Sequence, residues 1–145
     1  MAATEQSASS HARFLPLYHF VTAPLLVLYF IVSVSAFVRS PSEVTLVGSL
    51  AAFAIALGIG LARAQALTAQ DRIIRLEETL RLQRLLPQEA HGEIALLDRK
   101  EFIALRFASD AELPELFRRV RAGELGSQKE IKMAIRHWRP DHLRV

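Results

Sequence analysis

Two apolar stretches dominate the first half of the chain, and neither contains a charged residue. Residues 14–38 hold no Asp, Glu, Lys or Arg, and residues 44–62 are also free of them. A helix needs about 20 apolar residues to cross the hydrocarbon core of a bilayer. The pattern therefore predicts two transmembrane helices. The alternatives are two core helices of a soluble protein, which seldom stay uncharged for this length, and a signal peptide, whose apolar region is shorter.

A five-residue turn, RSPSE at residues 39–43, joins the two stretches. Pro41 and the serines beside it are typical turn residues, and a connection this short makes the two helices antiparallel. Residues 14–62 are therefore predicted to form a transmembrane hairpin with both ends on one side of the membrane.

The arginines predict which side that is. The turn carries a single arginine, Arg39. The other arginines near the predicted membrane lie next to the outer ends of the hairpin. These are Arg13, Arg63, Arg72, Arg75 and Arg81. Since segments rich in Lys and Arg stay in the cytoplasm, both termini are predicted to be cytoplasmic. Residues 1–13 then form an N-terminal cytoplasmic tail.

Small residues recur at every fourth position along the second apolar stretch and just beyond it. These residues, which we call the seam, are Gly48, Ala52, Ala56, Gly60 and Ala64. Small side chains four residues apart let another helix approach closely, and such packing drives helix association in lipid. The seam is therefore predicted to be a helix-packing interface. Its partner is the first helix of the same chain, a second copy or a different protein, and the sequence leaves all three open.

The helix is predicted to continue past the membrane as a cytoplasmic extension over residues 63–86. This segment contains no Gly or Pro, and strong helix formers fill it until Pro87 stops the helix. Two ion pairs four residues apart are expected to support it, Asp71 with Arg75 and Glu77 with Arg81.

An apolar stripe with spacings of four, three and four residues runs along this extension. We call these residues the stripe: Ala69, Ile73, Leu76 and Leu80. The repeat is too short to predict a long coiled coil, so the rest of the domain or a partner is expected to cover it. The predicted cytoplasmic partner surface consists of Ile73, Leu76, Leu80 and Trp138.

Residues 87–145 are predicted to form a small helical domain. Three segments fit the capping box, in which a Ser, Thr or Asp and a Glu three residues later each bind the other's backbone N–H. They are DRKE at 98–101, SDAE at 109–112 and SQKE at 127–130. Apolar residues at helical spacing follow each one, and the last helix is expected to pass through Trp138 and to end at Pro140.

Residues 88–96 are expected to form a further short helix that breaks at Gly92. No alternating strand pattern is present. The predicted fold class is therefore an all-α membrane protein, in which the second helix of a two-helix transmembrane hairpin continues into a small cytoplasmic helical domain.

Charge and composition narrow the function classes. Residues 63–145 hold 16 Lys and Arg against 13 Asp and Glu, and the whole chain has a net charge of +3. Nucleic-acid binding usually shows a one-sided basic face. A helix-turn-helix in the C-terminal domain is the alternative, but acidic residues interrupt its basic ones and its turn, AGELGS, is long for that motif. We therefore predict no nucleic-acid partner.

The sequence also lacks the usual motifs of catalysis. It has no Cys, no Gly-rich phosphate loop, no HExxH and no GxSxG. We predict no catalytic residues, no metal, no cofactor and no small-molecule substrate. His137, Asp141 and His142 allow a metal site at most as an alternative to a solvated tail, because Pro140 separates the histidines.

His19 is the only histidine inside either apolar stretch. A membrane histidine can bind a haem iron or a chlorophyll magnesium, which makes His19 a possible cofactor ligand. The alternative is an interfacial histidine that hydrogen-bonds lipid headgroups or a partner. The second apolar stretch contains no histidine to complete a bis-histidyl haem site.

Four segments carry a resemblance to a known family: HARFLPLYHFV, LTAQDRIIRLEETLRLQRLLP, LRFASDAELPEL and KEIKMAIRHWRPDHLRV. With these, the chain resembles a family of short two-span bacterial inner-membrane proteins known only as a domain of unknown function. The resemblance covers nearly the whole chain. It implies the bacterial cytoplasmic (inner) membrane and no assigned activity.

These features predict a non-catalytic accessory subunit that stabilises a larger bacterial membrane complex. Its partners would be the lipid bilayer and other integral membrane subunits. A photosynthetic reaction-centre complex is the first hypothesis for the host, and a respiratory complex is the second, because energy-transducing complexes contain many such small subunits. The alternatives are a stand-alone homo-oligomeric membrane scaffold or signalling protein, and a cofactor-carrying subunit that uses His19.

Overall fold

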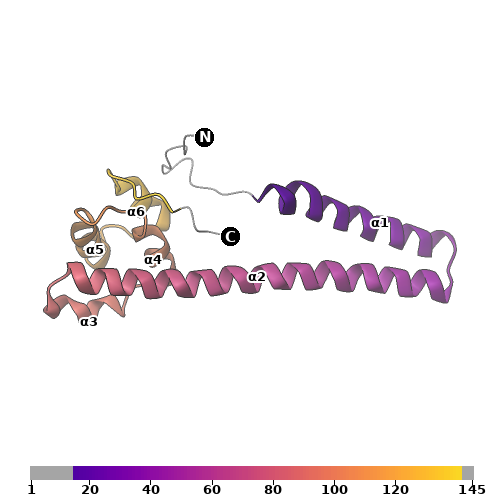
Figure 1. Ribbon diagram of the computed structural model, residues 1–145, viewed down its shortest axis with the longest axis horizontal. Coiled ribbons are helices and arrows are strands. Elements are labelled where there is room, and N and C mark those ends of the chain that lie inside the picture. The colour runs from indigo at the N-terminus through magenta and orange to yellow at the C-terminus, as the bar shows by residue number, and fades with distance from the viewer. Residues whose placement is uncertain (1–14, 142–145) are drawn as a thin grey trace. The chain divides into compact units, whose positions relative to one another are not determined.

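The computed structural model describes residues 15–141, so the predicted tail at 1–13 lies outside it. All regular elements within the described range are helices (Figure 1). They are η1 Leu17–Thr22 (a π-helix), α1 Ala23–Arg39, α2 Glu43–Leu85, η2 Gln88–Ala90 (a 3-10 helix), α3 His91–Ile94, α4 Arg99–Leu105, α5 Leu113–Arg121 and α6 Gln128–Ala134.

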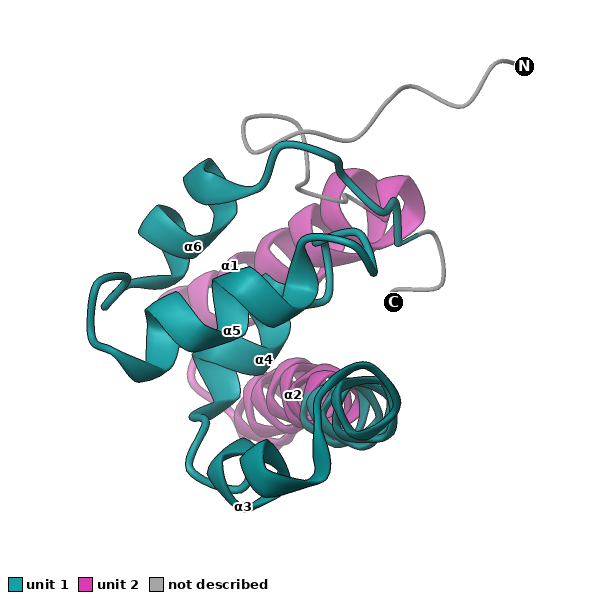
Figure 2. Cartoon of the chain, turned by 90° about the vertical axis from the view of Figure 1, so that its left-hand side faces the viewer, with its two compact units in different colours: residues 1–12, 68–144 teal, residues 13–67, 145 magenta. Residues whose placement is uncertain are grey.

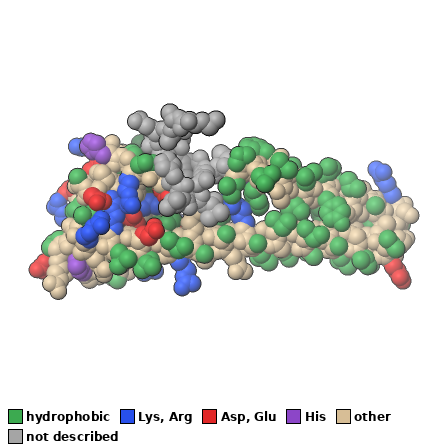
Figure 3. All heavy atoms as spheres, in the orientation of Figure 1, with side chains coloured by type: hydrophobic (Ala, Val, Ile, Leu, Met, Phe, Trp, Pro, Cys, Tyr) green, Lys and Arg blue, Asp and Glu red, His purple; other side chains and the backbone are tan. Residues whose placement is uncertain are grey.

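The chain divides into two compact units, shown in different colours in Figure 2. The hairpin unit, residues 13–67, contains η1, α1 and the first part of α2. The helical unit, residues 68–144, contains the rest of α2 and the helices α3 to α6. Figure 3 shows that hydrophobic side chains cover the helices of the hairpin unit, whereas charged side chains gather over the helical unit.

Two helices are long and apolar enough to cross a membrane. The first is Leu17–Arg39, with 23 residues and a mean hydropathy of 2.3, and the second is α2, whose most apolar window reaches 2.2. One unbroken helix of 43 residues forms α2, which confirms the predicted continuation of the helix into charged sequence. It continues because no helix-breaking residue follows Gly60 until Pro87.

The first of these two helices begins as a π-helix and continues as an α-helix from Ala23, next to Pro24. The N–H of Ala23 donates to the carbonyl of Tyr18, five residues back, as in a π-helix. The hydroxyl of Thr22 also reaches back five residues, to the carbonyl of Leu17 at 3.1 Å. Pro24, which has no N–H, stands in the first turn of α1. The proline thus lies where the hydrogen-bond register changes, and it interrupts neither helix type.

Reciprocal hydrogen bonds between Ser42 and Thr45 start α2 directly after the turn. The Thr45 hydroxyl accepts the N–H of Ser42 at 3.0 Å, and the Ser42 hydroxyl accepts the N–H of Thr45 at 3.2 Å. The arrangement matches a capping box with Thr in place of Glu. The Thr45 hydroxyl also contacts the carbonyl of Ser40 at 3.0 Å, which fixes the turn to the second helix.

The core of the helical unit consists of aliphatic and aromatic side chains from α2 and from every helix between α3 and α6. The largest fully buried side chains are Phe102, Phe107, Phe117, Leu82, Leu105, Leu113 and Ile131. Figure 2, in which α2 is seen nearly end-on, shows α3 to α6 gathered on one side of the helix. From α2, Ile74 and Leu82 are buried, and Leu86, directly after the helix, is buried beside them.

Two of the three predicted capping boxes are confirmed. Asp98 with Glu101 starts α4, and Ser127 with Glu130 starts α6, each with both reciprocal hydrogen bonds. The third prediction, Ser109 with Glu112, is wrong. Helix α5 begins after Glu112 without a side-chain cap.

Glu112 does not cap α5 because tertiary partners use its carboxylate. One oxygen accepts the N–H of His137 at 2.7 Å and the hydroxyl of Ser109 at 2.9 Å, and the other accepts the N–H of Arg136 at 2.8 Å. The same bonds end α6 early, at Ala134 instead of near Pro140 as predicted. Beyond α6 the chain leaves the helix at Ile135, bends at Arg136 and His137, and pairs with Ala108 through an isolated bridge at Trp138.

The segment after α2 also differs in detail from its prediction. A 3-10 turn at Gln88–Ala90 leads directly into α3, His91–Ile94, so Gly92 lies within a helix instead of breaking one. Ile94 anchors this short helix in the core, where it is 2% exposed.

Candidate functional site

The seam does not face a single neighbour within the chain. Ala52 is 1% exposed, while Gly48 and Ala56 are partly buried and Gly60 and Ala64 are exposed. A helix turns about 100° per residue, so each four-residue step rotates the seam by about 40° and five members spread over about 160°. One straight neighbour therefore contacts only part of it. A β-carbon placed on Gly48 or Gly60 would meet no atom within 4 Å.

Contacts at both ends of the hairpin show how α1 and α2 meet. Near the turn, the Ser49 hydroxyl donates to the carbonyl of Ser33 at 3.0 Å. Farther along, the rings of Phe30 and Phe53 lie 6.2 Å apart. At the open end, the guanidinium of Arg63 lies over the ring of Tyr18, 4.8 Å from its centre, a cation–π contact. Such contacts contribute about 0.5–1 kcal/mol at exposed sites.

His19 lies in the π-helix, and its ring contacts the backbone of Leu15, four residues earlier. Its Nδ1 is 3.0 Å from the carbonyl oxygen of Leu15 and 3.2 Å from the N–H of Leu15. Its ring packs edge-on against Tyr18 with 5.1 Å between ring centres. These local contacts orient the ring and occupy Nδ1. That His19 binds a cofactor stays a prediction.

The predicted cytoplasmic surface separates into two parts. Ile73, Leu76 and Leu80 are 56%, 61% and 59% exposed, so the stripe lies on the uncovered side of α2. Trp138 instead packs on the core, with its ring 4.9 Å from that of Phe107. The spacing of Trp138 from the preceding apolar residues predicts that it lies on a helix. It lies instead after α6, at the bridge with Ala108.

Phe107 is the centre of an aromatic and cationic cluster that the sequence analysis did not identify. The guanidinium of Arg106 lies 4.5 Å from the centre of the Phe107 ring, and the ammonium of Lys132 lies 5.5 Å from it. Both cations are buried, and Arg106 also lies 3.5 Å from Asp141. The cluster joins α4, α6 and the C-terminal segment. Only the tertiary fold brings Lys132 and Asp141 to Arg106 and Phe107, so no local sequence pattern predicts the cluster.

A buried ion network links α2 to the segment after α4 and to the C-terminal segment. The guanidinium of Arg81 bonds a Glu78 oxygen at 3.0 Å, an Asp110 oxygen at 2.6 Å and the carbonyl of Ala108 at 2.7 Å. The second Glu78 oxygen accepts a bond from Arg139 at 3.3 Å. Glu78 and Arg81 are 4% and 6% exposed.

The ion pairs expected along α2 have different partners from those predicted. Arg81 binds Glu78 and Asp110 instead of Glu77, and Asp71 lies 3.3 Å from Arg99 instead of pairing with Arg75. Asp110 and Arg99 lie outside α2, so a spacing of four residues within the helix cannot predict them as partners.

Burial and hydrogen bonds shift the pKa values of three carboxyl groups in opposite directions. Burial raises the pKa of Glu78, although the charge and hydrogen bond of Arg81 oppose it. The hydrogen bond from Arg81 lowers the pKa of Asp110. For Glu112, burial acts upward, but backbone N–H groups of Arg136 and His137 outweigh it and the pKa is lowered. All three groups therefore have structural roles that depend on their protonation.

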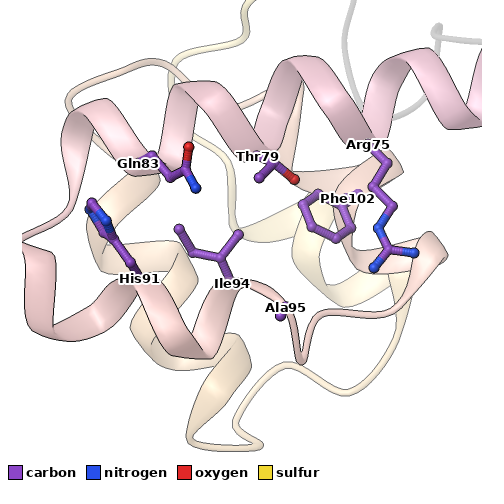
Figure 4. Close-up of a pocket in the computed structure, with 7 residues that line it drawn as sticks. All are labelled: Arg75, Thr79, Gln83, His91, Ile94, Ala95 and Phe102. Carbon is purple, nitrogen blue, oxygen red and sulfur yellow. The ribbon is translucent and has the colours of Figure 1, made fainter.

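A shallow groove of about 280 Å³ lies between α2, α3 and α4 (Figure 4). Its lining residues are Arg75, Thr79, Gln83, His91, Ile94, Ala95 and Phe102. Arg75 and His91 lie at opposite ends of the groove, with Thr79, Ile94 and Phe102 between them. No carboxylate is among the lining residues. Arg75 lies 5.7 Å from the centre of the Phe102 ring, and His91 Nε2 is 3.2 Å from the Leu86 carbonyl.

The alternative metal site near the C-terminus is not found in the part of the chain that is described. Among residues 15–141, no group of three or more His, Cys, Asp or Glu is arranged to hold a metal ion. His137 instead binds Glu112, with its Nδ1 3.2 Å from the carboxylate, and Asp141 faces Arg106. His142 lies outside the described residues.

Comparison with known proteins gives one match. A family model described as a family of unknown function (DUF6526) matches residues 1–145. No curated protein and no solved structure matches the chain. The predicted resemblance to a family of unknown function is thereby confirmed over the whole chain, while the bacterial membrane that it implies stays a prediction.

Proposed function

We propose that this chain, which belongs to the family of unknown function DUF6526, is a non-catalytic accessory subunit of a larger membrane assembly. In this role the hairpin unit anchors the chain in a bilayer, and the helical unit offers a surface on one side. The observation that carries the proposal is the apolar exterior of the two long helices.

The exposure of these helices favours a lipid environment over a soluble fold. Within the most apolar windows of Leu17–Arg39 and of α2, only 0% and 6% of residues are buried. A core helix of a soluble protein would bury most of such a window. Each fully exposed Val, Leu, Ile or Phe forgoes about 1.5–3 kcal/mol of transfer free energy in water. A bilayer removes this cost for both helices together.

The charged ends of the hairpin support an orientation with both termini in the cytoplasm. Arg63 lies at the open end of the hairpin, where it contacts Tyr18. Tyr and Arg are both common where a helix leaves the hydrocarbon for the headgroups. The turn has only Arg39 to oppose this end.

The arrangement of charges supports an accessory role over a catalytic one. Glu78, Arg81 and Asp110 hold α2 to the rest of the helical unit, and Glu112 holds the C-terminal segment. These carboxylates and guanidinium groups thus serve packing. The seam residues Gly60 and Ala64, which are exposed, offer another membrane helix a smooth contact.

The host of such a subunit, photosynthetic or respiratory, stays a prediction from the sequence. The alternative, a homo-oligomeric scaffold, shares the same anchor and differs in its partner. Both readings require an integral membrane protein whose exposed helix faces are covered by protein in the cell.

Two measurements test the proposal. The tagged chain, expressed in its native cells, should stay in the membrane during alkaline carbonate extraction. In mild detergent it should migrate well above the mass of the free chain. Release by carbonate, or migration as a free chain, would contradict an accessory membrane subunit.

A pair of matched variants separates specific contact from general damage. Gly60→Leu adds the same side chain as Gly58→Leu, but the two residues lie on opposite sides of α2 because they are two positions apart. Neither β-carbon meets an atom within 4 Å in the chain itself. Loss of the large complex by Gly60→Leu alone, about tenfold or more, is expected if another subunit packs on the seam. Equal behaviour of the two variants would contradict this interface.

A further inference from the structure

The stripe is apolar, regular and uncovered. Ile73, Leu76 and Leu80 are each more than half exposed, although their neighbours Ile74 and Leu82 are 5% and 0% exposed. The side of α2 that packs on the helical unit therefore excludes the stripe. A charged helix in water gains nothing from three large apolar side chains in a row on its free side. Their spacing therefore points to a partner.

The spacing of the stripe is that of a two-stranded coiled coil. Ala69, Ile73, Leu76 and Leu80 follow one another at intervals of four, three and four residues. Such alternation places them at the core positions d, a, d and a of a heptad repeat. A β-branched residue at a and Leu at d, as in Ile73 and Leu76, favour a parallel dimer.

The residues beside the stripe select the partner by charge. In a parallel coiled coil, position g of one helix faces position e of the next heptad on the other, five residues further on. Arg72 occupies g and Glu77 occupies e, and both side chains are exposed. Two copies in register would place each Arg72 opposite the partner's Glu77. The stripe is thus complementary in charge to itself.

We infer that the stripe binds a second copy of this chain as a short parallel coiled coil. The inference rests on the proposed membrane anchor, because two copies in one bilayer project α2 from the same face and hence in the same direction. An isolated coiled coil this short is marginal in water. Anchoring in one membrane raises the effective concentration of the two stripes and offsets that limit. The subunit that enters a larger assembly is then a dimer.

Cysteine crosslinking tests the register and the direction of the helices. The chain has no Cys, so a single introduced cysteine reports on one position. We expect Ile73→Cys and Leu80→Cys each to form a disulfide dimer in the full chain, both in mild detergent and in phosphatidylcholine vesicles. These residues lie about 10.5 Å apart along the axis. An antiparallel pair could therefore align only one of them with itself within the roughly 7 Å that a disulfide spans.

Arg75→Cys is the matched control. Arg75 is an exposed residue of the same helix, but it lines the groove beside α3 and does not belong to the stripe. It should remain monomeric under the same oxidation. If Arg75→Cys crosslinks as well as Leu80→Cys does, the contacts are random collisions and the inference is wrong.

A charge exchange identifies the partner as a second copy. In a Leu80→Cys background, Arg72→Glu or Glu77→Arg alone places like charges opposite each other twice per dimer. Each should lower the dimer fraction by about three- to tenfold. The double variant Arg72→Glu with Glu77→Arg restores both pairs and should restore crosslinking. A foreign partner keeps its own charges, so failure of the double variant to recover would overturn the inference.

The results also separate this inference from the proposed function. A chain that resists carbonate extraction but yields no homodimer at Ile73 or Leu80 overturns the dimer and leaves the membrane subunit intact. Crosslinks from Leu80→Cys to a protein of another mass, without homodimers, also overturn the dimer. A chain that forms both homodimers and recovers in the charge exchange, but leaves the membrane in carbonate, supports the dimer and contradicts the membrane subunit.

Discussion

The two units hold the same helix, α2, by different means. In the hairpin unit, α2 meets α1 through the rings of Phe53 and Phe30 and through the Ser49 hydroxyl, and it buries the small side chain of Ala52. In the helical unit, α2 buries Glu78 and Arg81 beside Ile74. A helix in lipid gains association chiefly from close approach, whereas a helix in water gains it from burial of apolar area.

Among the described residues, the buried charged side chains all lie in the helical unit. Each buried member of the ion network has several partners, as Arg81 has in Glu78, Asp110 and the Ala108 carbonyl. Because a buried charge without partners is costly, the network demands one arrangement of the segments that it joins. Among the described residues of the hairpin unit, no buried ion network restricts how the helices pack. The exposed faces of the hairpin can therefore contact neighbouring helices.

The largest effect is expected from removing Arg81. Arg81→Met leaves Glu78 buried with only the Arg139 contact at 3.3 Å. Removing one partner of a buried pair costs about 3–5 kcal/mol. Urea unfolding followed by the fluorescence of Trp138, the only tryptophan, should show this loss. Arg84→Met is the control, because Arg84 meets the same Asp110 from an exposed position at 3.5 Å, and it should cost less than about 1 kcal/mol. Equal losses would contradict a special role of the network.

The sequence predicts the parts of this molecule that depend on local rules. The long helix α2 and the caps at Asp98 and Ser127 follow from residue type and spacing, and the structure contains them. The lengths of both apolar helices can also be predicted from the sequence, because each length needs to be compared only with the thickness of a bilayer.

The sequence fails where distant segments compete for the same groups. Glu112 has the spacing of a cap, but the backbone of Arg136 and His137 takes its carboxylate. Trp138 has the spacing of a helix, but it pairs with Ala108 in the segment after α6. For the candidate surfaces, spacing finds the stripe and the seam, but only the fold shows that Ile73 stays exposed while Ile74 is buried.

A second, smaller effect tests the packing of the hairpin. Ala52 is 1% exposed, so Ala52→Leu overfills its contact and should destabilise the hairpin by about 1–3 kcal/mol. Unfolding by SDS in mixed micelles measures this. Ala54→Leu makes the same change at an exposed position two residues away and should change little. The unfolding of the helical unit should not respond to either variant. If Ala54→Leu is equally harmful, helix packing at Ala52 does not hold the hairpin.

Removal of a helix cap in the helical unit is expected to have a still smaller effect. The Ser127 hydroxyl accepts the N–H of Glu130 at 3.2 Å, and the Glu130 carboxylate accepts the N–H of Ser127 at 3.0 Å. Ser127→Ala should lower the free energy of unfolding by about 1 kcal/mol. Lys129→Ala, at an exposed position of the same helix, is the control and should be nearly neutral. A neutral result for Ser127→Ala would mean that α6 does not need its cap.

The smallest effect is a dependence on pH that only the helical unit should show. The pKa of Glu112 is lowered from its ordinary value of 4.5. Below that value the unfolded chain binds a proton before the folded chain does, so the stability from Glu112 is present above it. That stability is lost as the pH falls through the lowered pKa. Asp110 acts in the same direction, from an ordinary value of 3.8, but water screens its half-exposed carboxylate.

Glu78 changes the pH dependence of stability in the opposite direction to Glu112, so variants of the two residues have different expected effects. Burial raises its pKa above 4.5, so the unfolded chain loses its proton first as the pH rises. The contribution of Glu78 to stability therefore declines between 4.5 and its raised folded pKa. Urea midpoints of the helical unit, measured from about pH 3 to 7, should show a shallower acid-side loss for Glu112→Gln. For Glu78→Gln, the decline above 4.5 should disappear. An unchanged profile for both variants would mean that neither carboxyl group contributes to the pH dependence of folding.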